Sequence, residues 1–264
     1  MILPSPFWLH FGLGTYLAIT PTVRLLCSVG HISFRCINMA FIIYNDAAVV
    51  FRCDFNHHLN NIVLPSSLQH LRFGDRFNQN MDFVMLPYGL QTLTFGMDFN
   101  QSLDALWLPI GLQLLGLGDR FNQRMDNTNL PYGLQILRFG QDFNQTMEHT
   151  MMPHSIICLT FGDCFNQNMD NTTLPDGLHS LTFGNAFDQS LDHTTLPKDL
   201  HTLTFGDAFN QSLDNTVLPS GLRMLHFGIG FDQSMDNTIL PSGLEVMTLP
   251  RPGQPRPDAC HYFC

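Results

Sequence analysis

Residues 174–195, 196–217 and 218–239 read LPDGLHSLTFGNAFDQSLDHTT, LPKDLHTLTFGDAFNQSLDNTV and LPSGLRMLHFGIGFDQSMDNTI. They are one 22-residue sequence repeated three times, with no residue gained or lost between copies. Self-similarity at a fixed period of about 20 to 50 residues is typical of solenoids, in which each unit packs only against its neighbours. This stretch therefore predicts a repeat architecture rather than a conventional domain.

The same period continues over most of the chain. A Leu-Pro pair, or Met152-Pro153 in one copy, opens each repeat, and a Phe followed by Asn or Asp marks its middle. This Phe stands at positions 55, 77, 99, 121, 143, 165, 187, 209 and 231. Because a slip of one residue would turn inward side chains outward, the unbroken count predicts nine coils stacked in register.

The apolar positions predict how one coil folds. Leu68, Leu71 and Phe73 recur in equivalent places, and the last two alternate as strand residues do. Gly74 follows them and suits a corner, since glycine permits a positive φ or a close backbone approach. Pro65 lacks a backbone N–H and suits another corner. We therefore expect a mainly β, single-stack solenoid with one or two short strands in each coil.

Three segments follow from the extent of the repeat. Residues 55–249 form the predicted solenoid, and residues 250–264 form a proline-rich tail. Residues 1–54 have no clear period, although Val49 and Phe51 stand 22 residues before Leu71 and Phe73. This first segment is either a degenerate first coil that caps the solenoid or an insertion.

Composition excludes several classes of partner. The net charge is −10 and the only lysine is Lys198, so a nucleic-acid partner is disfavoured. No run of 18 apolar residues is present, which disfavours a membrane span. The seven cysteines are odd in number and none forms a C-x-x-C pair, so they indicate neither a disulfide framework nor a zinc site. We expect an intracellular, cytoplasmic protein.

One polar column consists of the residue after the repeated Phe. Asp188 and Asp232 occupy it in two copies, and Asn occupies the others. We expect a structural ladder in which these side chains bond backbone groups, which Asn and Asp both do locally. Asn100, Asn144 and Asn210 also fit the N-x-S/T glycosylation pattern, but a ladder would leave no room for a glycan. The ladder asparagines are Asn56, Asn78, Asn100, Asn122, Asn144, Asn166 and Asn210.

A second polar column is acidic. Like charges one coil apart repel, so we expect turn N–H groups to stabilise the carboxylates. The alternative is a row of bound cations, with the carboxylates as metal ligands. Eight equivalent acids do not resemble an active site, which needs one special group in one pocket, so we expect neither catalysis nor a cofactor. The column is Asp82, Asp104, Asp126, Glu148, Asp170, Asp192, Asp214 and Asp236.

Large apolar residues flank the Leu-Pro pairs of the earlier copies. Tyr88, Trp107, Ile110 and Tyr132 stand where later copies carry Asp176, Thr195, Lys198 or Ser220. Aromatic side chains outside a core are typical of interfaces, so we predict a patch that binds a protein partner. The alternative is that the N-terminal segment folds over them.

Recurrent threonines, such as Thr128 and Thr150, leave open a surface that binds ice or carbohydrate.

The repeat resembles the FNIP repeat, a relative of leucine-rich repeats. Leu-Pro, L-x-x-L-x-F-G and Phe-Asn carry the resemblance over residues 55–249. In this chain Gln follows the Phe-Asn or Phe-Asp pair from residue 77 onwards, where the family has Ile-Pro. The resemblance implies a leucine-rich-repeat-like solenoid that binds other proteins, and it supplies no catalytic residues that could be transferred to this chain. We therefore expect a monomeric, non-catalytic protein-interaction scaffold.

Overall fold

The structure, a computed structural model, describes residues 8–10, 16–18, 41–45, 47–59 and 62–250. The chain divides into two units, Met1–Met39 and Ala40–Cys264. In the first unit, β1 (Trp8–His10) and β2 (Tyr16–Ala18) pair antiparallel. The second unit contains every described repeat.

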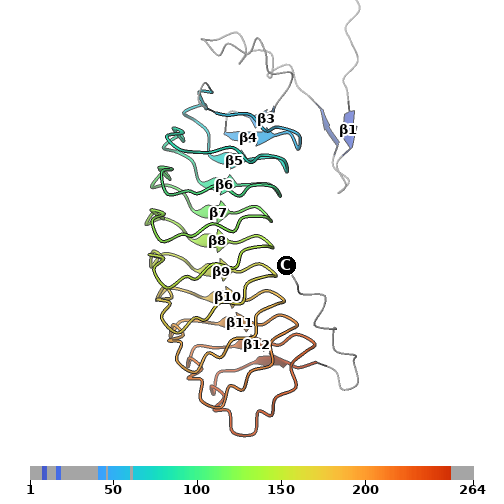
Figure 1. The fold of residues 1–264 in the computed structure, drawn as a ribbon, viewed down its shortest axis with the longest axis vertical. Coiled ribbons are helices and arrows are strands. Elements are labelled where there is room, and N and C mark those ends of the chain that lie inside the picture. Colours follow the sequence, from blue (N-terminus) through green and yellow to red (C-terminus); the bar gives the residue numbers. More distant parts are fainter. Residues whose placement is uncertain (1–7, 11–15, 19–40, 46, 60–61, 251–264) are drawn as a thin grey trace, which may run out of the picture. The chain divides into compact units, whose positions relative to one another are not determined.

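The second unit is a single-stack solenoid built on one sheet, which confirms the predicted fold class (Figure 1). Its sheet has eleven described strands in sequence order, and each coil contributes one strand. From β4 onwards, neighbouring strands are parallel and pair in register 22 residues apart, as in Leu71 with Leu93. The strands are β3 (Phe41–Asn45), β4 (Ala48–Phe51), β5 (His70–Arg72), β6 (Thr92–Thr94), β7 (Leu114–Gly116), β8 (Ile136–Arg138), β9 (Cys158–Thr160), β10 (Ser180–Thr182), β11 (Thr202–Thr204), β12 (Met224–His226) and β13 (Val246–Thr248).

Three tight turns give each coil three sides. In the coil that begins with β5, backbone bonds close turns at residues 74–77, 81–84 and 87–90, with N···O distances of 3.2, 3.1 and 3.1 Å. The strand forms the first side. The second side, residues 77–81, is extended but forms no strand. We call residues 83–88 and their equivalents, which run from the second turn into the third, the short side.

The repeat geometry begins before residue 55. Val49 of β4 pairs with Leu71 of β5, so β4 already occupies the position of a coil strand. β3 runs antiparallel to β4 at the first edge of the sheet. The described parts of residues 1–54 thus include one strand in the repeat register, while their role as a cap stays a prediction. The predicted tail lies outside the described residues from position 251 onwards.

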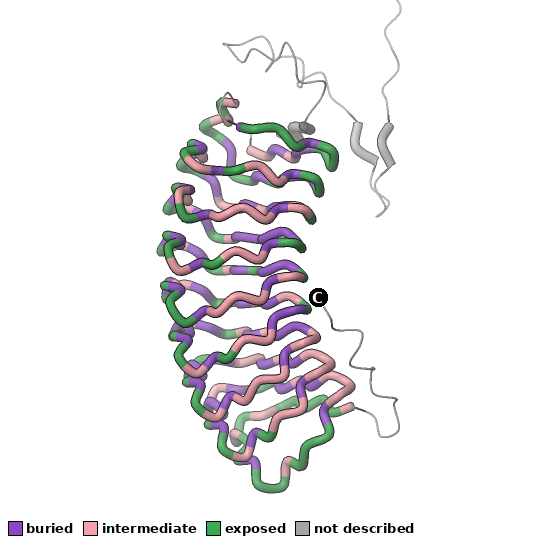
Figure 2. Tube along the Cα trace, in the orientation of Figure 1, coloured by how far each residue is buried: buried purple, intermediate pink, exposed green. Residues whose placement is uncertain are grey.

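The core consists of columns of similar apolar side chains, and buried stretches recur along every coil of the backbone trace (Figure 2). Leu71, Leu93 and their equivalents up to Leu225 are almost fully buried. Two Phe columns stack beside them, with ring centroids 5.2 Å apart for Phe73 and Phe95 and 6.0 Å apart for Phe77 and Phe99. Phe73 and Phe77 also stack within their coil, with centroids 4.1 Å apart. Since each ring has a further stacking partner in the next coil, a single coil cannot bury its apolar residues alone.

Glycine is required after each strand because the backbones of two adjacent coils approach closely there. A Cβ at Gly140 would overlap the carbonyl oxygen of Gly118, and the same holds at the equivalent glycines of neighbouring coils. The sequence left open whether this glycine permits a positive φ or a close backbone approach. The structure supports the close approach. Any larger residue here would push two coils apart.

Candidate functional site

The short side of the early coils exposes large apolar side chains. Trp107 is 81% exposed and Tyr132 is 85% exposed, although both belong to well-packed coils. Between them in the sequence, Leu112 and Leu115 face the core and are fully buried. The contrast shows that the short side presents these aromatic groups outwards. The early apolar patch, as we call it, comprises Phe83, Met85, Tyr88, Trp107, Ile110, Tyr132 and Met151.

The structure brings the four predicted patch residues onto consecutive coils. Tyr88, Ile110 and Tyr132 occupy the same position of three successive turns, each directly after the proline that begins the turn. Trp107 lies three residues before Ile110, on the same short side. Because adjacent strands lie about 4.8 Å apart, successive members of such a column are near neighbours.

Phe83 is a patch residue that the sequence interpretation missed. It is 80% exposed and has a φ of 60°, the one positive φ of a non-glycine residue within the described ranges. Equivalent positions carry small or polar residues, such as Ala105, Asn127 and His149. The sequence did offer a signal for Phe83, because no other copy has Phe, Tyr or Trp at this position. Sequence periodicity does not emphasise such isolated exceptions.

Apolar residues also recur on the short side at the other end of the solenoid. Val217 and Ile239 are more than four-fifths exposed, whereas Thr173 and Thr195 separate them from the early patch. In these later coils the position after the Leu-Pro pair is polar, as in Ser220 and Ser242. Only the early coils of the described range therefore carry apolar residues on both sides of the Leu-Pro pair.

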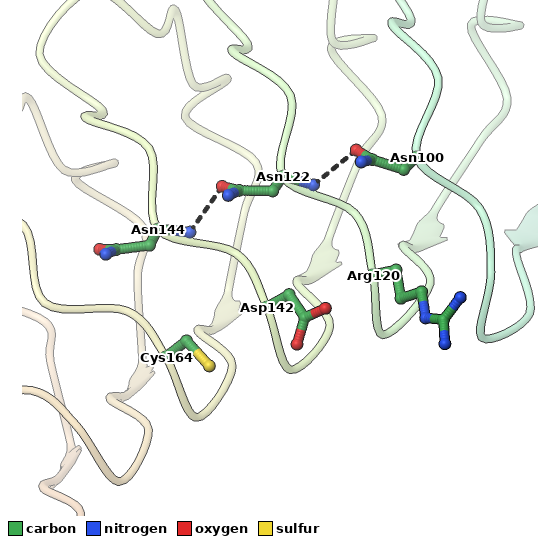
Figure 3. A pocket seen from close by; sticks show the side chains of 6 residues that line it. All are labelled: Asn100, Arg120, Asn122, Asp142, Asn144 and Cys164. Atoms are coloured by element: carbon green, nitrogen blue, oxygen red, sulfur yellow. Dashed lines mark hydrogen bonds between the residues drawn. The ribbon is translucent and has the colours of Figure 1, made fainter. Parts of the chain in front are cut away.

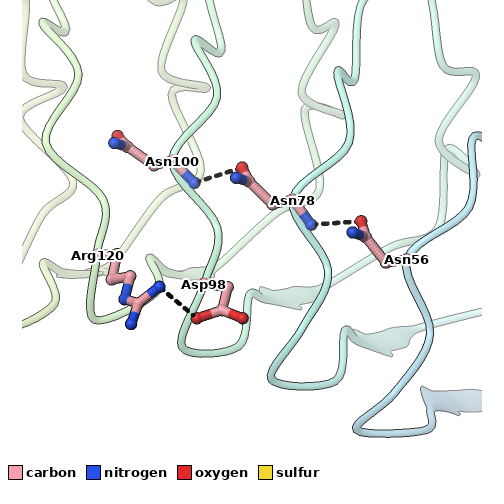
Figure 4. A network of polar contacts seen from close by, with 5 residues as sticks. All are labelled: Asn56, Asn78, Asp98, Asn100 and Arg120. Atoms are coloured by element: carbon pink, nitrogen blue, oxygen red, sulfur yellow. Dashed lines mark hydrogen bonds and ion pairs between the residues drawn. The ribbon is translucent and has the colours of Figure 1, made fainter.

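The Asn column lies on the second side and connects the coils (Figure 4). Asn78 Oδ1 accepts a hydrogen bond from the backbone N–H of Asn100 at 3.0 Å and another from Gln101 Nε2 at 2.8 Å. The same pair of bonds recurs from Asn56 to Asn210, through Asn100, Asn122, Asn144, Asn166 and Asp188. Side-chain oxygens thus take the place of backbone carbonyls on a side that forms no strand.

Six of the eight carboxylates of the acidic column bond side chains rather than turn N–H groups. Asp104 Oδ1 accepts a hydrogen bond from Thr128 Oγ1 in the next coil at 3.0 Å, and Asp192 and Asp214 bond Thr216 and Thr238 in the same way. In other coils the carboxylate bonds the residue two positions earlier, as Asp82 bonds Asn80, Asp126 bonds Arg124 and Asp170 bonds Asn168. The expected N–H partners do not occur among the described residues.

A shallow open groove of about 370 Å³ follows the Asn column on the second side (Figure 3). Arg120 at its edge forms an ion pair with Asp98, with Nη1 and Oδ1 3.1 Å apart. Asn100 and Asn122 supply the ladder bonds described above. Arg120, Asn100 and Asn122 in the groove thus hold adjacent coils together. Its lining residues are Asn100, Arg120, Asn122, Asp142, Asn144 and Cys164.

Neither a metal cluster nor a membrane helix is present in the described part of the chain. No three His, Cys, Asp or Glu side chains there come together to hold a metal ion. Within the same ranges, no helix has the length and apolar character to cross a bilayer. The weaker interpretation of the acidic column as a row of cation ligands therefore gains no support from its geometry.

Comparisons with known proteins agree with the geometry. The family model of the FNIP repeat matches residues 55–98, 99–136, 121–164, 165–208 and 209–251. The solved structure of CroV588, described as a novel circular LRR protein, is similar with a TM-score of 0.58 and 37% identity. The match covers 70% of this chain and 31% of that protein, so this chain spans about a third of the neighbour's length.

Two other comparisons add little. A leucine-rich repeat protein from Bacteroides ovatus ATCC 8483 matches at 13% identity over 87% of this chain and 71% of its own, but its TM-score of 0.18 supports no argument. No curated protein matches this sequence. The family model, in contrast, covers the whole run of coils with the Leu-Pro, Phe-Gly and Phe-Asn positions in phase. The chain therefore belongs to the FNIP repeat family.

Proposed function

We propose that this solenoid is a non-catalytic protein-interaction module and that the early apolar patch is its binding surface. The observation that carries the proposal is the exposure of Tyr88, Trp107 and Tyr132, each at 80% or more, on three consecutive coils. Buried aromatic side chains dominate the free energy of many interfaces, whereas a fully exposed one contributes little to folding. A partner that covers these three rings would bury a large apolar area.

The backbone beneath the patch supports binding because it is already ordered. Tyr88 lies in a turn that follows Pro87 and is closed by the bond from Leu90 N to Pro87 O. Proline fixes φ, and the next coil repeats the same turn with Pro109 and Leu112. A surface that is held in place before binding loses less conformational entropy when a partner docks.

The shape of the surface favours a protein over a small molecule. The patch extends over the outer face of several coils, whereas the groove in Figure 3 lies along the second side. Small ligands usually occupy concave pockets, and extended faces of repeat proteins suit larger partners. The resemblance to the FNIP family implies only that a protein is bound. Binding experiments are needed to identify that protein.

A double substitution tests the proposal. Trp107→Ala with Tyr132→Ala removes two rings from adjacent coils, and Thr195→Ala with Ser220→Ala changes the same two repeat positions four coils later. We expect the first variant to lose partners that the unchanged chain captures in quantitative pull-down, while the control retains them. Both variants should have the same melting temperature as the unchanged chain. Retained capture together with a lowered melting temperature would assign the rings a structural role instead.

Tryptophan fluorescence checks whether another part of the chain covers the patch. The chain has two tryptophans, so a Trp8→Phe variant reports Trp107 alone. At 81% exposure, Trp107 should emit at the long wavelength of solvated indole and be quenched efficiently by iodide. A short emission wavelength without added partner would show that the patch is already occupied, for example by the N-terminal segment.

A further inference from the structure

The early apolar patch is bordered by acidic residues, and the short side of its coils carries no lysine or arginine. Residues 82–88, 104–110 and 126–132 contain three aspartates, Asp82, Asp104 and Asp126, but neither lysine nor arginine. Glu148 continues the column in the next coil. The short side of these coils therefore combines large exposed apolar groups with negative charge along one edge.

These carboxylates differ in how far their charge is already compensated. Asp126 pairs with Arg124, whose Nη2 lies 2.9 Å from Oδ2, so its charge is largely balanced. Asp104 is exposed and accepts only a neutral hydrogen bond, from Thr128 Oγ1. Asp82 also has a neutral donor, Asn80 Nδ2 at 2.8 Å. A cationic group that approached the patch would find, three residues before Trp107, the carboxylate of Asp104 with no ion-pair partner among the described residues.

We propose that the early apolar patch binds a protein segment in which lysine or arginine stands beside large apolar side chains; this inference rests on the proposed function. The cation would pair with Asp104 and lie over the ring of Trp107, whose face attracts positive charge. The neighbouring apolar side chains would pack against Met85, Tyr88 and Tyr132. An acidic partner would be repelled by the same edge and by the net charge of −10.

The conformation of Phe83 supports a role for this surface beyond folding. An L residue at a φ of 60° is strained, and Phe83 gains little in return because its side chain is 80% exposed. The equivalent Asn127 and His149 occupy the same turn without a positive φ. Strain at an exposed aromatic residue is typical of binding positions, where the partner supplies the missing packing.

The experiment is selection of a phage-displayed library of random peptides on the immobilised full chain. A parallel selection uses the Trp107→Ala, Tyr132→Ala variant. We expect the peptides enriched only on the unchanged chain to combine Lys or Arg with aromatic or aliphatic residues and to be depleted of Asp and Glu. Apolar peptides enriched without any bias in charge would overturn the charge inference and leave the proposed function intact. Enrichment that is identical on both proteins would reject the patch itself, and with it the proposed function.

A charge-neutral substitution then tests Asp104 directly. In Asp104→Asn the new Oδ1 can still accept the bond from Thr128, so the fold is preserved. Asp192→Asn is the matched control, because Asp192 accepts the equivalent bond from Thr216 at the same 3.0 Å. We expect an enriched basic peptide to bind Asp104→Asn roughly fivefold more weakly, with a smaller dependence on salt. The control should bind as the unchanged chain does; equal weakening in both variants would contradict a local role for Asp104.

Discussion

Asn100 Oδ1 lies 3.0 Å from the backbone nitrogen of Asn122 and holds two successive coils together on the side that has no strand. Asn122 repeats the contact by accepting from Asn144 N at 2.9 Å and from Gln145 Nε2 at 3.0 Å. These part-buried N–H groups would otherwise have no acceptor, and a buried donor without a partner costs free energy. The ladder is thus the counterpart, on the second side, of the parallel sheet on the first.

Asn122→Ala removes this acceptor and is expected to lower the free energy of unfolding by about 2 kcal/mol. Urea denaturation measures the change. Asn122→Asp is the control, because the chain itself uses Asp188 at this position, where Asp188 Oδ1 accepts from Asn210 N at 2.8 Å. We expect the aspartate variant to stay within about 1 kcal/mol of the unchanged chain. Equal losses in the two variants would show that the acceptor oxygen is not what matters.

Gly140→Ala is expected to destabilise the solenoid by about 3 kcal/mol or more, because the added Cβ would collide with the carbonyl oxygen of Gly118. Gly89→Ala provides the comparison, since a Cβ there would have its nearest neighbours 3.8 Å away. Thermal and urea unfolding of both variants measure the difference. A mild effect at Gly140 would mean that adjacent coils can separate there at little cost.

The sequence alone predicted the stacking because stacking depends on period and little else. Once Leu71 and Leu93 stand one period apart, parallel strands in register place the Leu71 and Phe73 columns inside, and the structure pairs Leu71 with Leu93 directly. The same reasoning placed Tyr88, Ile110 and Tyr132 outside, since their column is polar in other coils.

What the sequence did not reveal depends on individual atoms and on single coils. Periodic Asn residues indicate a ladder, but not that Asn78 Oδ1 bonds both a backbone N–H and a glutamine amide of the next coil. The partner of Asp104 proved to be Thr128, 24 residues away, because the carboxylate reaches across to the next coil. Phe83 escaped notice because a backbone conformation adopted in one coil leaves no periodic trace.

Two threonines of one buried column should respond in opposite ways to the same substitution. Thr216 Oγ1 donates to Asp192 at 3.0 Å, whereas Thr194 Oγ1 is buried without a hydrogen-bond partner among the described residues. Valine has nearly the same shape and already occupies this column as Val84. We expect Thr194→Val to raise the free energy of unfolding by up to about 1 kcal/mol, because a buried unpaired hydroxyl is removed.

Thr216→Val, in contrast, is expected to lower the free energy of unfolding by about 1 kcal/mol, because Asp192 loses its donor. Chemical denaturation of the two variants side by side measures the sign of each change. Stabilisation by both valines would mean that the bond between Thr216 and Asp192 contributes nothing to stability.

Chelation tests whether the acidic column binds cations. Asp104 and Asp214 already accept hydrogen bonds from threonine hydroxyl groups, and Asp126 pairs with Arg124. We therefore expect EDTA and added calcium to leave the melting temperature unchanged. A cation present at about 100 times its dissociation constant would instead stabilise the fold by about 2.7 kcal/mol, which a thermal melt detects easily. A rise in melting temperature with calcium, reversed by EDTA and abolished in Asp170→Asn with Asp192→Asn, would establish the cation row that the hydrogen bonds argue against.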